Sequence, residues 1–352
     1  MRPQSDGRRR AVVLTVRYPH TLANPVARPS LLLAERGFDV HIVDTWHEWP
    51  DRDYPGCRLW AEPSRISALR RVLSLRPDML FMEGGSWMLP LTARFRRSWL
   101  RCTGVPTRPS RRLAQHLLLK GPALVGVQNP YDAARLQIPA RRRLDLPAPV
   151  DLGFWSTPVE RDPAFWTSRG IEPPNHVIIL TANLVALKRP AEIVAAAAPL
   201  VRERKGLLIA FAGATVEPEV GADITRTAEE LGVSDRTILL GQLEREEVRQ
   251  VLTWGAIHVV NSERESQCMA LYESLAAGVP NSIRNIPWLT MAFPALPSHN
   301  SVEELRANLV RLLDDEAYAR ETVAQSKQAL QWADIEAHDR TFDEGLARLG
   351  LA

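Results

Sequence analysis

Hydrophobic and polar positions in the first half of the chain alternate between two patterns. Short apolar runs, typical of buried strands, cover 11–16, 39–43, 79–82 and 123–127. Amphipathic stretches, typical of helices, cover 25–36, 64–75 and 110–119, and a short helix is expected from Asn129-Pro130. Buried strands that alternate with helices predict a parallel sheet with helices on both faces.

The alternation resumes after residues 139–175, which are rich in proline, arginine and tryptophan and lack sustained periodicity, as in a linker or crossover. The strands expected beyond this stretch are 176–181, 207–212, 237–240 and 256–260. The expected helices are 190–204, 222–231, 244–253, 269–277, 302–313, 317–329 and 334–349. The pattern predicts an α/β protein with two Rossmann-like doubly wound domains facing a cleft. We expect domains at 1–150 and 151–330, with a C-terminal helix in 331–352 packing back on the first domain.

Composition narrows the class of protein. The chain has 352 residues, 45% of them apolar, and a formal net charge of +3, which fits a folded globular protein and gives no indication of nucleic-acid binding. Its three cysteines have no metal-like spacing, so we expect a reducing, cytoplasmic setting without disulfides. No apolar run reaches the roughly 18 residues of a membrane span. The run 11–16 is too short for a signal peptide and is interrupted by Arg17.

Two glutamates with seven residues between them follow the expected strand 256–260. Glu265 lies just beyond the carboxyl end of that strand, where ligands bind in open α/β sheets. Glu273 lies in the next helix, which ends at Gly278-Val279-Pro280. A carboxylate can accept both hydrogens of a ribose diol, and the helix N-terminus near Met269 offers N–H donors to a diphosphate. The segment therefore meets the requirements that a nucleotide-sugar site would impose.

Lysine is rare in this chain, with four lysines against 40 arginines. Lys188 follows the expected strand 176–181 and precedes Pro190, a favoured first residue of a helix. An ammonium group beside a helix N-terminus would stabilise the charge on a departing diphosphate. The sequence has no cluster of metal-ligand residues. We therefore expect no metal and no cofactor, with a nucleotide-diphosphate sugar as co-substrate.

Residues 176–290 resemble the donor domain of the GT-B-fold retaining glycosyltransferases of the family 4 type (glycosyl transferases group 1). The resemblance rests on the turn 181–190 with its lysine, on the glycine-ended segments 211–213 and 238–241, and on Glu265-x7-Glu273 with its Gly-Val-Pro tail. Residues 150–155 are similar to the segment that leads into the donor domain. The resemblance implies a retaining glycosyltransferase that moves a sugar from a nucleotide-diphosphate sugar to an acceptor hydroxyl. It also makes 1–150 the acceptor-side domain and 151–330 the donor domain.

The resemblance implies a role for each matching residue. Glu273 would bind the nucleotide ribose, Lys188 the diphosphate, and Glu265 hydroxyls of the transferred sugar. Glu265 and Lys188 are the candidate catalytic residues. The expected donor-binding residues are Asn183, Lys188, Arg189, Gly213, Gly241, Leu243, Ser266, Gln267, Cys268, Met269 and Glu273.

The chain also departs from the family pattern. Asn183 replaces the family's arginine, which would leave the phosphate clamp weaker or shared with Arg189. Ser266-Gln267-Cys268 replaces Gly-Phe-Gly, a change that bears on sugar selectivity. The histidine that the family carries in its first domain cannot be placed.

The acceptor side is indicated by fewer residues. Glu83 and Gly84 end an expected strand, and Trp46 lies in a loop after another, where it could stack on an acceptor or simply cover the domain edge. A UDP- or GDP-type sugar is the expected donor, and the acceptor is left open among a small molecule, a lipid-linked carrier and a polysaccharide. An arginine-rich segment between Arg94 and Arg112 indicates either peripheral contact with the inner face of a membrane or a solvated basic surface.

Two other functions fit the same pattern. One is an enzyme of this fold that epimerises or hydrolyses a nucleotide sugar without an acceptor. The other is a catalytically degenerate protein kept for binding or assembly, which the departures from the family pattern motivate.

Overall fold

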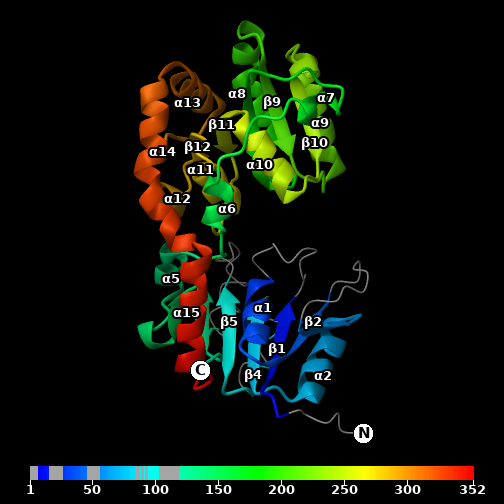
Figure 1. Cartoon of the computed structure of the whole chain (residues 1–352), viewed down its shortest axis with the longest axis vertical. Coiled ribbons are helices and arrows are strands. Elements are labelled where there is room, and N and C mark those ends of the chain that lie inside the picture. The colour runs from blue at the N-terminus through cyan, green and yellow to red at the C-terminus, as the bar shows by residue number, and fades with distance from the viewer. Residues whose placement is uncertain are drawn as a thin grey trace. The chain divides into compact units, whose positions relative to one another are not determined.

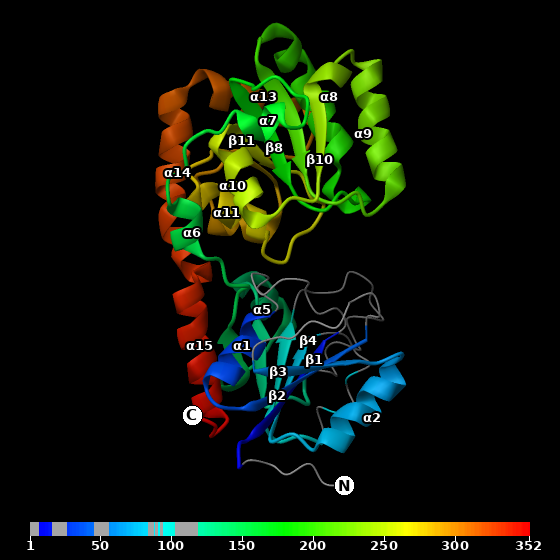
Figure 2. The same cartoon turned by 45° about the vertical axis from the view of Figure 1, so that its right-hand side comes forward.

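The computed structural model describes residues 7–15, 27–45, 56–83, 88, 91, 94–102 and 119–352. The chain divides into two compact units. Unit 1 comprises Met1–Pro149 and Ile335–Ala352, so it contains both ends of the chain, and unit 2 comprises Val150–Asp334. Figures 1 and 2 show each unit as a sheet covered by helices.

The described part of unit 1 forms a parallel sheet in the order β3-β2-β1-β4-β5-β6-β7. Its strands are β1 (Arg10–Thr15), β2 (Asp39–Asp44), β3 (Cys57–Ala61), β4 (Met79–Glu83), β5 (Ser98–Cys102), β6 (Leu124–Val127) and β7 (Arg143–Asp145). The sequence pattern missed three of them. β3 is a half-exposed edge strand, β5 is fully buried but carries Arg101, and β7 has only three residues, so none presents a sustained apolar run.

Helices cover both faces of this sheet. α1 (Arg28–Glu35) and α15 (Ile335–Arg348) pack on one face through Leu33 and Phe342. α2 (Arg65–Leu75) and α5 (Pro130–Leu136) pack on the other. The helix expected at 110–119 lies outside the described residues except for Leu119.

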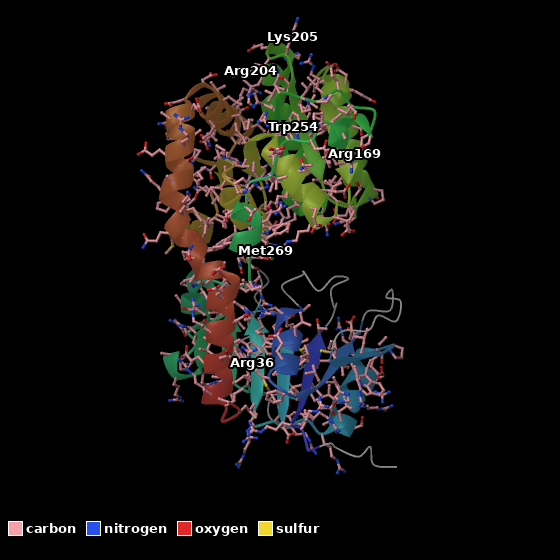
Figure 3. All side chains as sticks on the ribbon, viewed as in Figure 1. Arg36, Arg169, Arg204, Lys205, Trp254 and Met269 are labelled. Atoms are coloured by element: carbon pink, nitrogen blue, oxygen red, sulfur yellow. The ribbon has the colours of Figure 1, made fainter. Side chains whose placement is uncertain are left out.

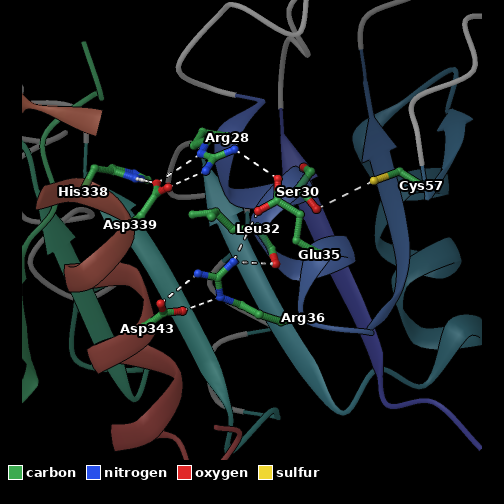
Figure 4. Close-up of polar contacts among 9 residues, drawn as sticks. All are labelled: Arg28, Ser30, Leu32, Glu35, Arg36, Cys57, His338, Asp339 and Asp343. Atoms are coloured by element: carbon green, nitrogen blue, oxygen red, sulfur yellow. Dashed lines mark hydrogen bonds and ion pairs between the residues drawn. The ribbon is translucent and has the colours of Figure 1, made fainter. Parts of the chain in front are cut away.

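Charged side chains join α1 to α15 (Figure 4). Arg28 Nε donates to Asp339 Oδ1 at 3.1 Å, and Arg36 Nη2 donates to Asp343 Oδ2 at 2.8 Å. Each guanidinium makes a second contact with the same carboxylate, so both pairs are bidentate. The C-terminal helix is therefore an integral part of unit 1.

Unit 2 contains a parallel sheet in the order β10-β9-β8-β11-β12-β13. Its strands are β8 (His176–Thr181), β9 (Leu207–Ala212), β10 (Thr237–Gly241), β11 (Gly255–Val260), β12 (Asn281–Arg284) and β13 (Ser298–His299). The chain winds outward in one direction from β8 and in the other from β11. The order therefore reverses between these two central strands, which makes their carboxyl ends the topological switch point.

The helices of unit 2 complete its two-sided arrangement. They are α6 (Leu152–Ser156), α7 (Ala164–Thr167), α8 (Pro190–Glu203), α9 (Pro218–Glu230), α10 (Arg245–Thr253), α11 (Met269–Ala276), α12 (Pro287–Ala292), α13 (Val302–Asp314) and α14 (Glu316–Leu330). α8, α9 and α13 share one core with the sheet, and α11 packs beside β11 and β12. α9 starts four residues earlier than expected because Pro218 occupies a first-turn position, where its missing N–H costs nothing.

The sequence prediction for unit 2 was correct in its main elements. The strands 176–181 and 207–212 are confirmed at both ends. The stretch 139–175 was expected to be irregular, but it contains β7 together with the short helices α6 and α7. β12, α12 and β13 were not expected, since they have only two to six residues each.

Candidate donor site at the switch point of unit 2

The loops after β8 and β11 meet at the switch point. The 3-10 turn η3 (Ala186–Lys188) follows β8, and the turn with Glu265 follows β11. The backbone N–H of Glu263 donates to the carbonyl oxygen of Leu187 at 3.0 Å, which ties the two loops together. Figure 3 shows Met269, the first residue of α11, at the opposite end of unit 2 from Arg204 and Lys205, which precede β9. The candidate groups therefore gather at the carboxyl edge of the sheet.

Lys188 and Glu265 form an ion pair at this edge. Lys188 Nζ contacts Glu265 Oε1, and the Ser262 hydroxyl donates to the same oxygen at 2.6 Å. Burial has the largest single effect and would lower the pKa of Lys188, but the charge and hydrogen bond of Glu265, together with Cys268, outweigh it and the pKa is raised. The sequence predicted both residues for one site but assigned them to different parts of a ligand. Their direct pairing is a finding of the structure.

Glu273 is half-buried on α11. Among the described residues, no side chain or backbone group hydrogen-bonds to its carboxylate or forms an ion pair with it. Burial raises the pKa of Glu273 to about 7, and the positive charge of Arg245 opposes that rise only in part. A desolvated carboxylate with unused acceptor capacity is costly to the folded state unless a ligand uses it.

The N-terminus of α11 begins from an unusual backbone conformation. Cys268, its N-cap residue, has φ 62° and lies in the left-handed region, where a residue with a Cβ is disfavoured relative to glycine. Burial raises the pKa of the Cys268 thiol well above its usual range, so this sulfur is a neutral group beside Lys188 and Glu265. Gln267 is buried, whereas Ser266 and Met269 are half-buried. The Ser266-Gln267-Cys268 departure thus lies directly at the start of the helix.

The loops after β8, β9 and β10 approach one another closely. The N–H of Gly213 donates to the carbonyl oxygen of Gly241 at 2.8 Å. A Cβ on Gly213 would lie 2.0 Å from the carbonyl oxygen of Ala182, so only glycine fits there. Asn183 is exposed next to this contact, and Leu243 is buried beyond β10.

Arg189, which was expected to share in binding phosphate, pairs with Glu192 in this structure. Its guanidinium pairs with Glu192 in the first turn of α8, and its backbone is left-handed, with φ 48°. The Glu192 carboxylate also accepts from Arg284 at 3.1 Å. In this structure the positive charge of Arg189 is therefore already engaged, and Lys188 is the cation that faces Glu265.

Arg245 is a neighbour of Glu273 that sequence reasoning missed. It is the first residue of α10, its guanidinium lies 3.7 Å from the ring centroid of Phe154, and it pairs with Asp151 at 3.1 Å. Its position four residues beyond Gly241, the last residue of β10, was the available signal.

Of the three acceptor-side candidates in unit 1, only Glu83 lies among the described residues. Glu83 is described and is buried, with its Oε1 accepting from Arg101 Nη1 at 2.6 Å. Burial raises the pKa of Glu83, and Arg101 opposes that rise. Gly84 and Trp46 lie outside the described residues.

Among the residues the structure describes, no group of three or more His, Cys, Asp or Glu side chains is arranged to hold a metal ion. In the same part of the chain, no helix combines the length and apolar character needed to cross a bilayer.

Comparisons with known proteins agree with this geometry. Residues 166–293 match the family model described as glycosyl transferases group 1. No curated protein matches the chain. Among solved structures, the chain is similar to sucrose-phosphate synthase from Thermosynechococcus elongatus, with 15% identity, a TM-score of 0.77, and coverage of 97% of this chain and 99% of that one.

Two other solved structures have comparable similarity. The Anabaena protein HepE in complex with UDP and glucose gives 12% identity, a TM-score of 0.76, and coverage of 96% and 99%. A trehalose-6-phosphate synthase studied for glycosyl transfer with retention gives 14% identity, a TM-score of 0.75, and coverage of 96% and 99%. At such identities the likeness establishes the fold. The chain therefore has the GT-B fold, and residues 166–293, within its second unit, match the glycosyl transferases group 1 model.

Proposed function

We propose that this protein is a retaining glycosyltransferase that moves a sugar from a nucleotide-diphosphate sugar to an acceptor hydroxyl. The observation that carries the proposal is the half-buried Glu273 on α11, which has no partner among the described residues and lies in the same switch-point site as the Lys188–Glu265 pair. The glycosyl transferases group 1 match over residues 166–293 supports it. A UDP sugar is the first donor to test, because HepE was solved with UDP and glucose.

The proposed donor complex uses each group for the charge it carries. Ionised Glu273 accepts hydrogen bonds from the ribose diol, which removes the cost of its empty acceptor positions. Lys188 and the N-terminal amides of α11 bind the diphosphate, and the base lies against Gly241 to Leu243. Glu265, held by Ser262, contacts hydroxyls of the transferred sugar, with the backbone from Gln267 to Met269 beside it.

In this proposal Lys188 also stabilises the negative charge of the leaving group. Its ammonium group pairs with Glu265, and a diphosphate would compete for that ammonium group. The acceptor hydroxyl attacks from the leaving-group face, and the β-phosphate takes its proton. The configuration at the sugar is thereby retained, as in the transfer studied for trehalose-6-phosphate synthase. Lys188 and the positive end of α11 stabilise the departing charge, so the proposal requires no metal.

Substitution of the two key residues tests the proposal. Lys188→Ala and Glu273→Ala are each expected to abolish release of nucleoside diphosphate from a panel of UDP and GDP sugars. Lys205→Ala, at the amino edge of the sheet, and Glu246→Ala, on the exposed surface of α10, are matched controls that should keep full activity. Full turnover in Lys188→Ala or Glu273→Ala would refute the assignment.

Two alternatives predict other products from the same assay. An epimerase or hydrolase of this fold would release an epimer or a free sugar from the donor without an acceptor. A degenerate binding protein, which Asn183 in place of the family's arginine motivates, would give no product. If no nucleoside diphosphate raises the melting temperature, donor binding itself is excluded, since a ligand at 100 times its Kd adds about 2.7 kcal/mol of stability.

We also propose that unit 1 contacts the anionic inner face of a membrane, whether the acceptor is a small molecule, a lipid-linked carrier or a polysaccharide. Unit 1 contains 27 Lys and Arg against 16 Asp and Glu, a formal charge of +11, whereas unit 2 has 17 against 25, or −8. On α2, Ile66 and Leu73 are 64% and 41% exposed, and Arg65 and Arg70 are exposed beside them. Such a mixed basic and apolar stripe suits an anionic lipid surface.

Vesicle co-sedimentation tests the membrane contact. The protein should sediment with vesicles of phosphatidylcholine and phosphatidylglycerol but not with pure phosphatidylcholine, and Ile66→Ser/Leu73→Ser should weaken this binding. Val216→Ser/Met291→Ser, which removes similarly exposed apolar side chains from unit 2, is the matched control. Equal binding to both vesicle types, or none to either, would contradict the proposal.

A further inference from the structure

His258 is a fully buried polar residue in the centre of the unit 2 sheet. It lies on β11 and has 0% exposure. Its Nε2 lies 3.3 Å from the backbone nitrogen of Thr181 and 3.0 Å from the Thr181 hydroxyl, and its Nδ1 lies 2.7 Å from Asn281 Oδ1. Both ring nitrogens are therefore used, one toward the end of β8 and one toward the start of β12.

The neighbouring groups fix which nitrogen carries the proton. The backbone N–H of Thr181 can only donate, so Nε2 must accept. Asn281 Nδ2 donates to the carbonyl oxygen of Val279 at 2.8 Å, which orients Asn281 Oδ1 toward the imidazole as an acceptor. Nδ1 of His258 therefore carries the hydrogen, and the ring is neutral. Burial lowers the pKa of His258 to about 4, in agreement with this arrangement.

A further bond extends the chain of contacts into α11. The Ser274 hydroxyl lies 3.1 Å from Asn281 Oδ1, and Ser274 is fully buried. It is the residue next to Glu273. Thr181, at the other end of the chain of contacts, is the last residue before the loop that leads to Lys188. His258 itself is on β11, the strand that leads to Glu265.

The three segments joined in this way are those that carry the three candidate groups of the donor site. β8, β11 and α11 each provide one member of the hydrogen-bonded series, and Asn281 at the start of β12 links His258 to Ser274. We propose that neutral His258 is a positioning residue, which holds the Lys188 loop, the Glu265 turn and the Glu273 helix in the spacing that a nucleotide-diphosphate donor requires. This inference rests on the proposed function for its ligand, and on the hydrogen bonds alone for its mechanics.

A preorganised site of this kind has a measurable advantage. Each donor-binding group is then already in place, so binding does not have to order separate loops. Replacement of His258 by phenylalanine keeps a ring of similar size but takes the imidazole acceptor from the Thr181 N–H and leaves Asn281 Oδ1 with only the Ser274 hydroxyl. Each unpaired buried group costs about 1–3 kcal/mol, and the segments can relieve that cost by moving.

Hydrogen exchange gives a test that does not depend on the function. In His258→Phe, amide exchange should accelerate in residues 182–188 and 269–276 more than in the rest of unit 2. Thr181→Val, which removes one hydroxyl donor, should have a smaller effect in 182–188, and Thr181→Ser should restore wild-type exchange. His338→Phe is the matched control, since His338 is also fully buried but lies in unit 1. Unchanged exchange in both segments, or uniform acceleration across unit 2, would overturn the proposal.

Donor affinity gives the second readout. UDP affinity and the KM for the donor should each worsen by about tenfold in His258→Phe, corresponding to roughly 1.4 kcal/mol, with the acceptor KM unchanged. The His338→Phe control should keep wild-type affinity. If the exchange pattern appears but wild-type protein binds no nucleotide, the proposed function fails and the positioning role stands. If wild-type protein binds UDP and His258→Phe binds it equally well, the positioning role fails.

Discussion

At the scale of single residues, the candidate donor site contains groups that the described part of the protein does not satisfy. Glu273 is desolvated without a described partner, and Cys268 has a left-handed backbone. Both features lower the stability of the free protein. Such features cluster at functional sites because a ligand, or the geometry it needs, compensates for them.

Glu273→Gln is predicted to stabilise the protein at alkaline pH. The pKa of Glu273 is about 7 in the folded protein, above its ordinary value of 4.5, so the folded state binds this proton more tightly. That contribution is complete below pH 4.5 and is lost as the pH rises through 7. Glutamine, which is always neutral, should therefore raise the free energy of unfolding at pH 8 by up to about 3 kcal/mol, with no gain at pH 4.

Urea unfolding at the two pH values measures this effect, with Glu246→Gln on the exposed face of α10 as the control. The same variant should lose nucleotide affinity. A variant that is destabilised at pH 8, or that gains stability equally at both pH values, would show that Glu273 is not a strained carboxylate.

Cys268→Gly is predicted to stabilise unit 2. Glycine adopts the left-handed region without the steric cost of a Cβ, so the substitution should add roughly 1 kcal/mol to the free energy of unfolding. Thermal unfolding provides the measurement, and Cys268→Ala, which keeps the Cβ, is the control. A lower melting temperature in the glycine variant than in the alanine variant would contradict this account.

At the scale of elements, buried polar side chains join the strands of unit 2 where the apolar core ends. His258 joins β8 to β12, and His299 on β13 contacts Ser282 Oγ at 3.0 Å and Asn261 Oδ1 at 3.1 Å. Burial lowers the pKa of both histidines to about 4. The loops that carry the candidate site are therefore fixed by neutral imidazoles.

Acid is predicted to destabilise unit 2 through these rings. Between pH 6.5 and 4, these two histidines become protonated in the unfolded chain but stay neutral in the folded protein. The free energy of unfolding therefore falls as the pH falls through this window. In His258→Phe, the loss of stability between pH 7 and pH 4.5 should be smaller than in wild type by about 2 kcal/mol. Chemical unfolding at both pH values tests this, and an unchanged pH dependence would mean that His258 is protonated in the folded state.

The elements also show which parts of the fold a sequence pattern can reveal. Strands such as β8 and β9 were predictable because each contains a run of five or six consecutive apolar or β-branched residues. β3 was not predictable because its burial pattern is half-exposed. β5 was not predictable because it contains Arg101, whose burial depends on the tertiary partner Glu83. Likewise, the spacing of Lys188, Glu265 and Glu273 predicted one shared site. The Lys188–Glu265 pair, Arg245 and the His258 contacts depend on distances in space that no spacing encodes.

At the scale of the whole molecule, the two units differ in the sign of their net charge. Unit 1 is basic and includes the C-terminal helix α15, joined to α1 by the Arg28–Asp339 and Arg36–Asp343 pairs. Unit 2 is acidic overall, yet its candidate site presents Lys188 and a helix N-terminus to an anionic ligand. Local geometry, rather than net charge, therefore favours a diphosphate there.

The pairs between α1 and α15 are predicted to contribute unequally to the stability of unit 1. Arg28 and Asp339 are both mostly buried, whereas the Asp343 side chain is 50% exposed. A double-mutant cycle with Arg28→Gln and Asp339→Asn should give a larger coupling energy than one with Arg36→Gln and Asp343→Asn, for which about 0.2–1 kcal/mol is expected. Equal coupling energies from unfolding measurements would contradict this ranking.

The most direct test of the central claim is the binding of UDP to wild-type protein, measured by titration calorimetry beside Lys188→Ala and Glu273→Ala. The account predicts saturable binding of one UDP per chain, a loss of affinity of about tenfold or more in each variant, and unchanged affinity in Lys205→Ala. Binding that is unaffected by both Lys188→Ala and Glu273→Ala would place the nucleotide elsewhere and contradict the account.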